Sequence, residues 1–278
     1  MLLEFKKRMR KRFKGYKPKD FRRAAVRKWL IRNYRGDEYL CPICDTSLSR
    51  FKPIFKSFMR NLAEHGFVHP ITAFETLNIK MYLCPSCGSS DRERLYALFL
   101  RKKFEIIDRE QKYSFIDFAP SLALSKWIRK HPFVEYVTTD LSRKDVDLNV
   151  DITDMRNFED NTIDMFLCSH VLEHVPDDRK AMRELYRIIK PGGFGILMVP
   201  IVNTLPTTHE DATKTTPQER TKFFGQGDHL RLYERRDYVK RLEEIGFSVN
   251  QYDINFFGSE TFRKHGIHDN SMLYVVEK

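Results

Sequence analysis

Long apolar runs are missing from this sequence, and their absence excludes two classes of protein. No stretch approaches the length of a transmembrane helix, and the N-terminus lacks the uninterrupted apolar core of a secretory signal peptide. Internal repeats and low-complexity tracts are missing as well. The 278 residues are 41% hydrophobic and 13% aromatic, enough for a packed core in one full-sized domain and a small one. We therefore expect a globular cytosolic protein, with peripheral attachment to the inner face of the membrane left open.

Acidic residues are scarce at the N-terminus. Residues 1–35 hold 15 lysines and arginines against Glu4 and Asp20, whereas the other 243 residues hold 34 basic and 36 acidic residues. The formal net charge of +11 therefore belongs to an N-terminal arm, in which apolar and aromatic residues are interleaved with the charges. This basic amphipathic pattern suits an anionic membrane surface, a nucleic acid or an acidic partner, and equally a solvated helix that covers part of the body.

Cysteine is rare, but four of the five cysteines form two Cys-x-x-Cys pairs. Cys41 and Cys44 stand in CPIC, and Cys84 and Cys87 stand in CPSC. Two such pairs supply the four thiolates of a tetrahedral zinc site, and disulfides are disfavoured in the cytosol, so we predict a structural zinc ribbon. The alternative is two reduced pairs without a metal. The fifth, Cys168, has no activating base nearby and is expected to be an inert buried thiol.

Strands and helices alternate from residue 113 onward, after one helix that follows the second cysteine pair. Apolar strands are expected at YSFIDF, FVEYVTTD, TIDMFLC and FGILMVP, with helices at SLALSKWIRKH and DDRKAMRELYRIIK. The last two apolar runs, FSVNQYDI and SMLYVVEK, are close enough to pair antiparallel at an edge. This alternation predicts an α/β fold with a mostly parallel sheet, helices on both faces and an antiparallel C-terminal edge.

Glycine is missing from SFIDFAPSLALS, the loop after the first expected strand, where a nucleotide-binding sheet usually carries it. Because ligands of such sheets lie across the carboxyl ends of the strands, the residues after each strand are the binding candidates. Here they are Asp117, Ala119 and Pro120. Alanine keeps the loop nearly as small as glycine would, but Pro120 gives up an amide that a phosphate would need. The loop thus argues against a dinucleotide more than against a cofactor without phosphate.

The run from DITDM to MVP, residues 151–200, resembles the central segment of class I S-adenosylmethionine-dependent methyltransferases. The resemblance rests on its acidic pair, its VLEHV helix start and its KPGG stop, in that order, and extends over 113–278. It implies the Rossmann-like seven-stranded methyltransferase sheet and S-adenosylmethionine as the cofactor.

The resemblance also implies where the cofactor lies. Asp140 ends the second strand and would bind the ribose, while Asp151 and Ile152 would lie beside the adenine. Ser169 and His170 would be near the methionine portion. The expected cofactor contacts are Asp117, Ala119, Pro120, Asp140, Leu141, Asp151, Ile152, Ser169 and His170.

A narrower resemblance concerns the whole chain. The two cysteine pairs, SSDRERL, FAP in place of the glycine loop, and FFGQGDHLRLYERRDYVKRLEEIGF resemble a bacterial group of zinc-ribbon methyltransferases, often found among genes for surface-polysaccharide assembly. Glu234-Arg235 stands where that group often has a glycine, which puts the local turn in doubt. The expected domains are a basic arm at 1–37, a zinc ribbon at 38–90, a linking helix at 91–112, and a class I methyltransferase domain at 113–278 with a lid insertion at 201–228.

Polar residues in and after the lid are the candidates for the acceptor site. Methyl transfer needs an aligned nucleophile and, for a hydroxyl, a group that takes its proton. We predict His229 as this base, with Asp228 or Glu210 orienting it; the alternative is that these groups only hold the lid in place. Arg231 suits an anionic group on the acceptor, such as a phosphate or uronic carboxylate. The predicted acceptor contacts are His209, Arg231 and Tyr233.

One motif competes with this interpretation. HVLEH, from His170 to His174, has the His-x-x-Glu-His spacing of inverted zinc peptidases, in which two histidines one turn apart bind zinc. However, His170 follows a buried strand directly, and the helix beyond runs into KPGG, which argues against a peptidase. We expect His174 to be a partly buried helix residue, and Glu173 to bond to the backbone or to line the cofactor pocket.

The sequence therefore predicts an S-adenosylmethionine-dependent methyltransferase with a structural zinc. Its expected acceptor is a sugar hydroxyl on a glycan or a lipid-linked precursor of a bacterial surface polysaccharide, with the arm on anionic lipid. The first alternative is an RNA methyltransferase that binds RNA through the zinc ribbon and the basic arm. Against it, the body of the chain has no net positive charge and an Asn-Pro-Pro-aromatic motif is absent. The second is a binding protein that kept the fold without catalysis. The oligomeric state is left open.

Overall fold

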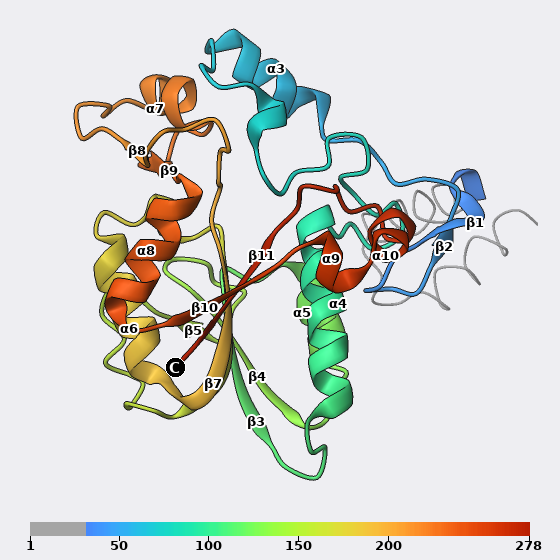
Figure 1. The fold of residues 1–278 in the computed structure, drawn as a ribbon, viewed down its shortest axis with the longest axis vertical. Helices are drawn as coiled ribbons and strands as arrows, with labels where there is room; N and C mark the ends of the chain where they lie inside the picture. Colours follow the sequence, from blue (N-terminus) through green and yellow to red (C-terminus); the bar gives the residue numbers. More distant parts are fainter. Residues whose placement is uncertain (1–31) are drawn as a thin grey trace, which may run out of the picture.

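The structure is a computed structural model that describes residues 32–278. Most of the basic arm, and with it the prediction about what the arm binds, lies outside these residues. Within them, a central sheet carries helices on both faces (Figure 1). None of the helices in this range is both long and apolar enough to cross a membrane.

Seven strands form the central sheet of the described residues. They lie in the order β10-β11-β7-β6-β3-β4-β5, with parallel pairing from β7 to β5 and antiparallel pairing of β11 with both β7 and β10. This order and pairing confirm the predicted methyltransferase-type sheet with an antiparallel C-terminal edge. The strands are β3 (Tyr113–Phe118), β4 (Val134–Asp140), β5 (Leu148–Asn149), β6 (Ile163–Ser169), β7 (Ile189–Met198), β10 (Ser248–Tyr252) and β11 (Leu273–Glu277).

Two pairs of helices cover the faces of the sheet. They are α4 (Asp91–Ile106) and α5 (Leu122–Ile128) on one face, and α6 (Asp178–Ile188) and α8 (Arg235–Ile245) on the other (Figure 1). Ser90 caps α4 by accepting from the amide of Glu93, and Asp177 caps α6 in the same way, so two helix starts predicted from the sequence are confirmed. The helix expected over 91–112 ends six residues earlier than predicted.

The start of β7 differs from the prediction. The Pro191–Gly193 turn, expected to stop the preceding helix, lies inside β7, because α6 already ends at Ile188. Gly192 has a φ of 78°, and a Cβ on Gly195 would stand 2.1 Å from the ring of Phe166. The two glycines therefore allow the turn and the close approach of β7 to β6.

The ribbon hairpin is joined to the C-terminal part of the chain. The imidazole Nδ1 of His265 donates to the carbonyl of Leu40, at 2.7 Å. The side chain of Arg94, at the start of α4, donates to the carbonyls of His265 and Gly266 on one side and of Ser89 on the other. The elements involved are β1 (Arg35–Leu40), β2 (Ser47–Leu48), α9 (Ile254–Phe257) and α10 (Ser259–Lys264).

The segment between the two cysteine pairs packs on the lid. Phe74 forms a bridge with Val202, and the amide of Val68 donates to the carbonyl of Lys222 at 3.0 Å. A small separate core joins the two parts through Ala73, Val202, Phe224 and Leu232. Figure 1 accordingly shows α3 and α7 close together. The elements are α3 (Lys56–Glu64) and η1 (Ile71–Ala73), and β8 (His209–Glu210), α7 (Pro217–Phe224) and β9 (Arg231–Leu232).

Candidate functional site

The four paired cysteines come together as the sequence predicts. The Sγ atoms of Cys41 and Cys87 are 3.7 Å apart, and those of Cys44 and Cys84 are 3.8 Å apart. Sulfurs that bind one zinc ion tetrahedrally at about 2.3 Å are about 3.8 Å from one another. The geometry and the soft thiolate ligands therefore fit a structural zinc ion held by these four residues.

The turns of the two knuckles explain how the thiolates converge. Asp45 after the first pair and Gly88 after the second both have positive φ, at 52° and 81°. Their amides bond back to the carbonyls of Cys41 and Cys84, each at 2.9 Å. By contrast, Cys168 is fully buried and burial raises the pKa of its thiol, in line with the expected inert role.

A large cavity of about 680 Å³ opens at the carboxyl ends of β3, β4 and β6. We name it the strand-end cavity. Its lining includes six of the nine predicted cofactor contacts, namely Ala119, Asp140, Leu141, Asp151, Ile152 and His170.

A smaller cavity of about 150 Å³, the α4 cavity, shares Phe118 and Ala119 with the strand-end cavity and extends toward α4. It is lined by two further predicted contacts, Asp117 and Ser169. Pro120 is the exception, because it lines neither cavity, and its carbonyl accepts from Nη1 of Arg143 at 2.7 Å. Pro120 thus fixes the conformation of the loop without facing either cavity.

The loop without glycine keeps a glycine-like backbone. Ala119 has a φ of 53°, the left-handed conformation that favours glycine, and its amide donates to the carbonyl of Thr139 at 2.8 Å. The alanine therefore replaces glycine in the same turn at a cost in strain.

Asp117 is an unusual carboxyl group in the α4 cavity. Burial raises its pKa to about 7, although the hydroxyl of Tyr136 donates to it and favours the charged form. It is therefore largely protonated below neutral pH.

Residues at the start of α4 belong to this site, and the sequence reasoning missed them. Ser90, Arg92, Glu93 and Tyr96 line the α4 cavity, and the guanidinium of Arg92 contacts Nε2 of His170. The Ser-x-x-Glu spacing in SSDRERL correctly signals a capping box. It carries no information about which part of the sheet the helix end approaches, which is why these contacts were not found.

A third cavity, the apolar cavity, of about 220 Å³, lies between the lid and the segment that joins the cysteine pairs. Arg92 and His170 line it and also line the α4 cavity and the strand-end cavity, respectively, so all three spaces meet at these two side chains. His229 and Gln226 supply further polar groups. The apolar walls are Ile54, Phe55, Phe58, Ile71, Phe74, Leu77, Val199, Pro200, Ile201 and Phe224.

His229 faces the apolar cavity, but its orienting partner is not one that the sequence predicts. Its Nδ1 donates to the carbonyl of Phe224 at 3.0 Å, and burial lowers the pKa of the imidazole, so the ring is neutral with Nε2 as the acceptor. Asp228 is instead 3.3 Å from Nδ1 of His174. The predicted orienting role of Asp228 is therefore wrong in this geometry, and that of Glu210 is wrong because its carboxylate is bound elsewhere.

Glu210 and two predicted acceptor contacts form a structural network instead. Arg231 is 5% exposed and donates to Glu210 and to the carbonyls of Leu172, Val175 and Pro176. The fully buried hydroxyl of Tyr233 donates to Asp178 at 2.8 Å. With four of its five N–H donors bound in this way and the side chain buried, Arg231 holds the turn after β6 rather than an acceptor.

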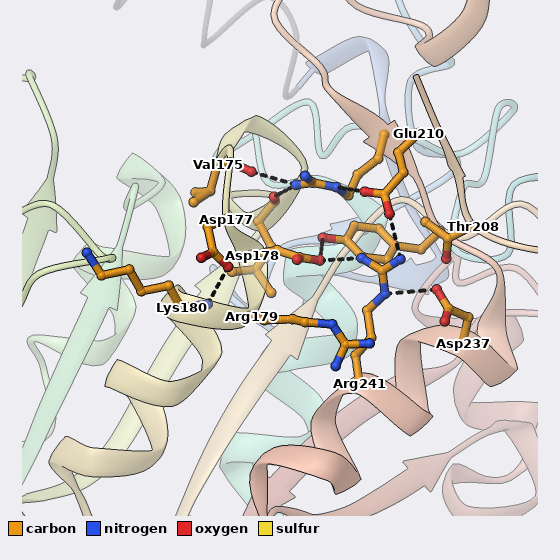
Figure 2. Close-up of polar contacts among 12 residues, drawn as sticks. Val175, Asp177, Asp178, Arg179, Lys180, Thr208, Glu210, Asp237 and Arg241 are labelled. Atoms are coloured by element: carbon orange, nitrogen blue, oxygen red, sulfur yellow. Dashed lines mark hydrogen bonds and ion pairs between the residues drawn. The ribbon is translucent and has the colours of Figure 1, made fainter. Parts of the chain in front are cut away.

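Arg241 completes this network and is shown with its partners in Figure 2. Its guanidinium lies 2.9 Å from Glu210, 2.9 Å from Asp178 and 2.8 Å from Asp237. His209 also lies outside the apolar cavity, with its ring against Phe224 at 5.2 Å between centroids. The predicted acceptor contacts are thus supports of the lid, which was the alternative left open by the sequence.

The turn after β6, η2 (Leu172–His174), brings a buried carboxylate to His229. Oε1 of Glu173 accepts from Nδ1 of His170 at 2.9 Å and lies 4.0 Å from Nε2 of His229. Burial opposes ionisation of Glu173, but the surrounding histidines lower its pKa to about 2. His174 ends the short 3-10 turn η2, whereas His170 precedes this turn and has a φ of 57°, so the two residues do not form the helical histidine pair of a zinc peptidase.

Comparison with known proteins agrees with this geometry. Residues 123–197, from α5 to β7, match the family model described as a methyltransferase domain. This stretch resembles a methyltransferase domain. The match leaves out both cysteine pairs and the lid.

Curated relatives include the ubiquinone/menaquinone biosynthesis C-methyltransferases UbiE of Escherichia fergusonii and of Escherichia coli K12. The E. fergusonii protein is 26% identical over 110 residues, which cover 35% of this chain and 44% of the relative; the E. coli protein gives the same values. The chain thus matches less than half the length of these relatives.

Solved structures with a similar fold include the CurJ carbon methyltransferase and an S-adenosylmethionine-dependent methyltransferase from Archaeoglobus fulgidus. The first is 16% identical with a TM-score of 0.44, covering 66% of this chain and 57% of the other. The second is 13% identical with a TM-score of 0.44, covering 68% and 95%.

Proposed function

We propose that this chain is an S-adenosylmethionine-dependent methyltransferase whose acceptor binds in the apolar cavity. The observation that carries the proposal is the meeting of three cavities at Arg92 and His170. A donor that fills the strand-end and α4 cavities would present its sulfonium methyl at this junction, next to an acceptor in the apolar cavity. Eight of the nine expected cofactor contacts line the two donor cavities.

Residues of this chain would bind and orient the cofactor and would take the proton from the acceptor hydroxyl. Asp140 and Asp151 would accept hydrogen bonds from the ribose and adenine, and Glu93 would meet the positive charge of the methionine end. An acceptor hydroxyl would bond to the methyl carbon as the carbon–sulfur bond breaks, leaving a neutral thioether. Its proton needs a base, and Nε2 of His229 is a neutral acceptor without a partner at the wall of the apolar cavity.

The proposed acceptor is a sugar hydroxyl on a glycan or lipid-linked precursor. The aromatic walls of the apolar cavity suit the apolar face of a sugar ring, and Arg92, Gln226 and His229 suit its hydroxyls. The predominance of apolar side chains favours a second candidate, an aromatic acceptor with an apolar body. The UbiE relatives are named for ubiquinone and menaquinone biosynthesis, and quinone precursors belong to the same class of acceptor.

Calorimetry with S-adenosylmethionine and its demethylated product tests the donor half of the proposal. We expect binding of both, and no heat with either would refute the proposal and favour a non-catalytic binding protein. Transfer of labelled methyl groups to glycan fractions, apolar aromatic compounds and bulk RNA then separates the acceptors. Phe58→Ala, in the cavity wall, should raise KM for the acceptor about tenfold without changing cofactor affinity, whereas Val68→Ala, outside the wall, should change neither.

The basic arm is proposed to dock the enzyme on anionic lipid. The 15 basic residues in the first 35 carry the argument, since each contributes about 1 kcal/mol near an anionic surface. Full-length protein should sediment with vesicles that contain phosphatidylserine and lose this binding without residues 1–31. Equal binding to neutral vesicles, or retention only on RNA with a steep salt dependence, would contradict the proposal.

A further inference from the structure

Three side chains at the junction of the cavities form a cluster that the proposed function leaves unexplained. Glu173 and His174 come from η2, and His229 comes from the loop before β9. One ligand atom from each residue lies within 4.8 Å of the other two. His174 lines the strand-end cavity and His229 lines the apolar cavity, so the cluster stands between the donor and acceptor spaces.

Two polar atoms of this cluster are buried without a partner. They are Oε2 of Glu173, which is fully buried, and Nε2 of His229, in a residue that is 3% exposed. The distance of 4.0 Å between Oε1 of Glu173 and Nε2 of His229 is too long for a hydrogen bond. Leaving a buried polar group unpaired costs about 1–3 kcal/mol, and more for a charged group. Both groups offer electron pairs, so a cation held between the Glu173 carboxylate and Nε2 of His229 would compensate for the missing partners.

The contacts behind the cluster are those of metal-binding histidines. Nδ1 of His229 donates to the carbonyl of Phe224, and Nδ1 of His174 lies 3.3 Å from a carboxylate oxygen of Asp228. Histidines that bind a metal through one nitrogen usually donate the other N–H to a carbonyl or carboxylate. Oε1 of Glu173 is held in turn by Nδ1 of His170. The ligand atoms are therefore oriented before a metal arrives.

We propose that Glu173, His174 and His229 bind a divalent transition-metal ion, with zinc as the best match. Two imidazoles and one carboxylate are a known zinc ligand set, and such sites keep a fourth position open for water or substrate. The site is separate from the four cysteines. Its use for catalysis rests on the proposed function: the metal would lower the pKa of an acceptor hydroxyl in the fourth position, the proton would pass to solvent water, and His229 would be a ligand instead of the base.

Metal analysis of the full chain tests the site. After loading with zinc and desalting, we expect about two zinc ions per chain, one at the cysteines and one at the cluster. His229→Ala and Glu173→Gln should each lower the content to about one. His209→Ala, a nearby histidine outside the cluster, should leave it unchanged. A content of one in the parent, or no loss in either variant, would overturn the proposal.

A second set of measurements distinguishes loss of the metal site from unfolding of the variant and from failure of the proposed function. Cobalt at the cluster should add weak visible bands without thiolate charge transfer, and His174→Gln, at the half-exposed ligand, should remove these bands and keep those of the cysteines. Near-ultraviolet circular dichroism checks that each variant is folded. Cofactor binding without a second metal would refute the metal site alone, whereas a second metal without cofactor binding would refute the methyltransferase proposal alone.

Discussion

At the scale of single residues, Ala119 takes the left-handed backbone conformation that glycine usually has in the loop after β3. Its φ of 53° places a Cβ in the left-handed region, at the turn that lines both donor cavities. Such a conformation costs an alanine about 1–2 kcal/mol, and the bond from its amide to Thr139 holds it there. The strain sits where the cofactor is proposed to bind, as is common at functional sites.

Ala119→Gly should therefore be tolerated. Relief of strain is offset by about 0.4–1 kcal/mol of extra entropy in the unfolded chain, so the free energy of unfolding should stay level or rise by up to about 1 kcal/mol. Denaturant titration measures it, and calorimetry should give unchanged cofactor affinity. Ala63→Gly, on the exposed side of α3, is the control and should lose up to about 1 kcal/mol. An equal loss in both variants would contradict the argument.

Asp117 gives a prediction about pH. Its pKa is raised by burial from 3.8 to about 7, so between these values unfolding releases a proton and stability falls as the pH rises. Asp117→Asn keeps the shape and removes this dependence. The free energy of unfolding of the variant, relative to that of the parent, should rise by up to about 4 kcal/mol between about pH 4 and pH 8. Both proteins are measured without cofactor. A difference that does not change with pH would contradict the prediction.

At the scale of elements, α4 links three parts of the molecule through Arg94. Its guanidinium, fully buried, donates to the carbonyls of Met81, Tyr82 and Ser89 on either side of the second knuckle and of His265 and Gly266 after α10. The ring of Phe51 lies 3.8 Å from the guanidinium carbon. One side chain thus fixes α4 to the ribbon and to the C-terminal helices.

Arg94→Met should be strongly destabilising. Several buried carbonyls would lose their donors, so the free energy of unfolding should fall by about 2–4 kcal/mol. Hydrogen exchange at residues 259–267 should become faster in the variant. Lys102→Met, at an exposed position of the same helix, should change stability by less than about 0.5 kcal/mol. A loss no larger than in this control would show that Arg94 does not join the elements.

Local rules were sufficient for the sheet and for the lining of the strand-end cavity, but not for the apolar cavity. Asp140 and Asp151 were correctly expected at the carboxyl ends of the strands because the end of a strand is visible in the sequence. Arg231 was misassigned because its partners are carbonyls of residues 172–176, which sequence spacing does not reveal. The walls at Phe58 and Phe74 depend on contacts between the ribbon segment and the lid, about 130 residues apart.

At the scale of the whole molecule, the ribbon is part of the site rather than an appendage. The segment between the cysteine pairs builds the walls of the apolar cavity, and the helix after the second pair brings Arg92 and Glu93 to the α4 cavity. The strand-end cavity, by contrast, is lined mainly by the ends of the strands and the loops that follow them, with no residue from the ribbon or α4. Order in the metal knuckles should therefore determine how well the α4 cavity and the apolar cavity are formed.

Cys84→Ser tests this coupling. Loss of one thiolate should release zinc from the knuckles and loosen the start of α4, only seven residues further along the chain. We expect cofactor affinity to fall at least about tenfold, or about 1.4 kcal/mol, by calorimetry. Cys168→Ala, a buried cysteine outside the knuckles, should keep the zinc of the knuckles and bind the cofactor within about twofold of the parent. If Cys84→Ser loses this zinc while cofactor affinity is unchanged, the ribbon does not support the donor site, and α4 is held in place by the sheet alone.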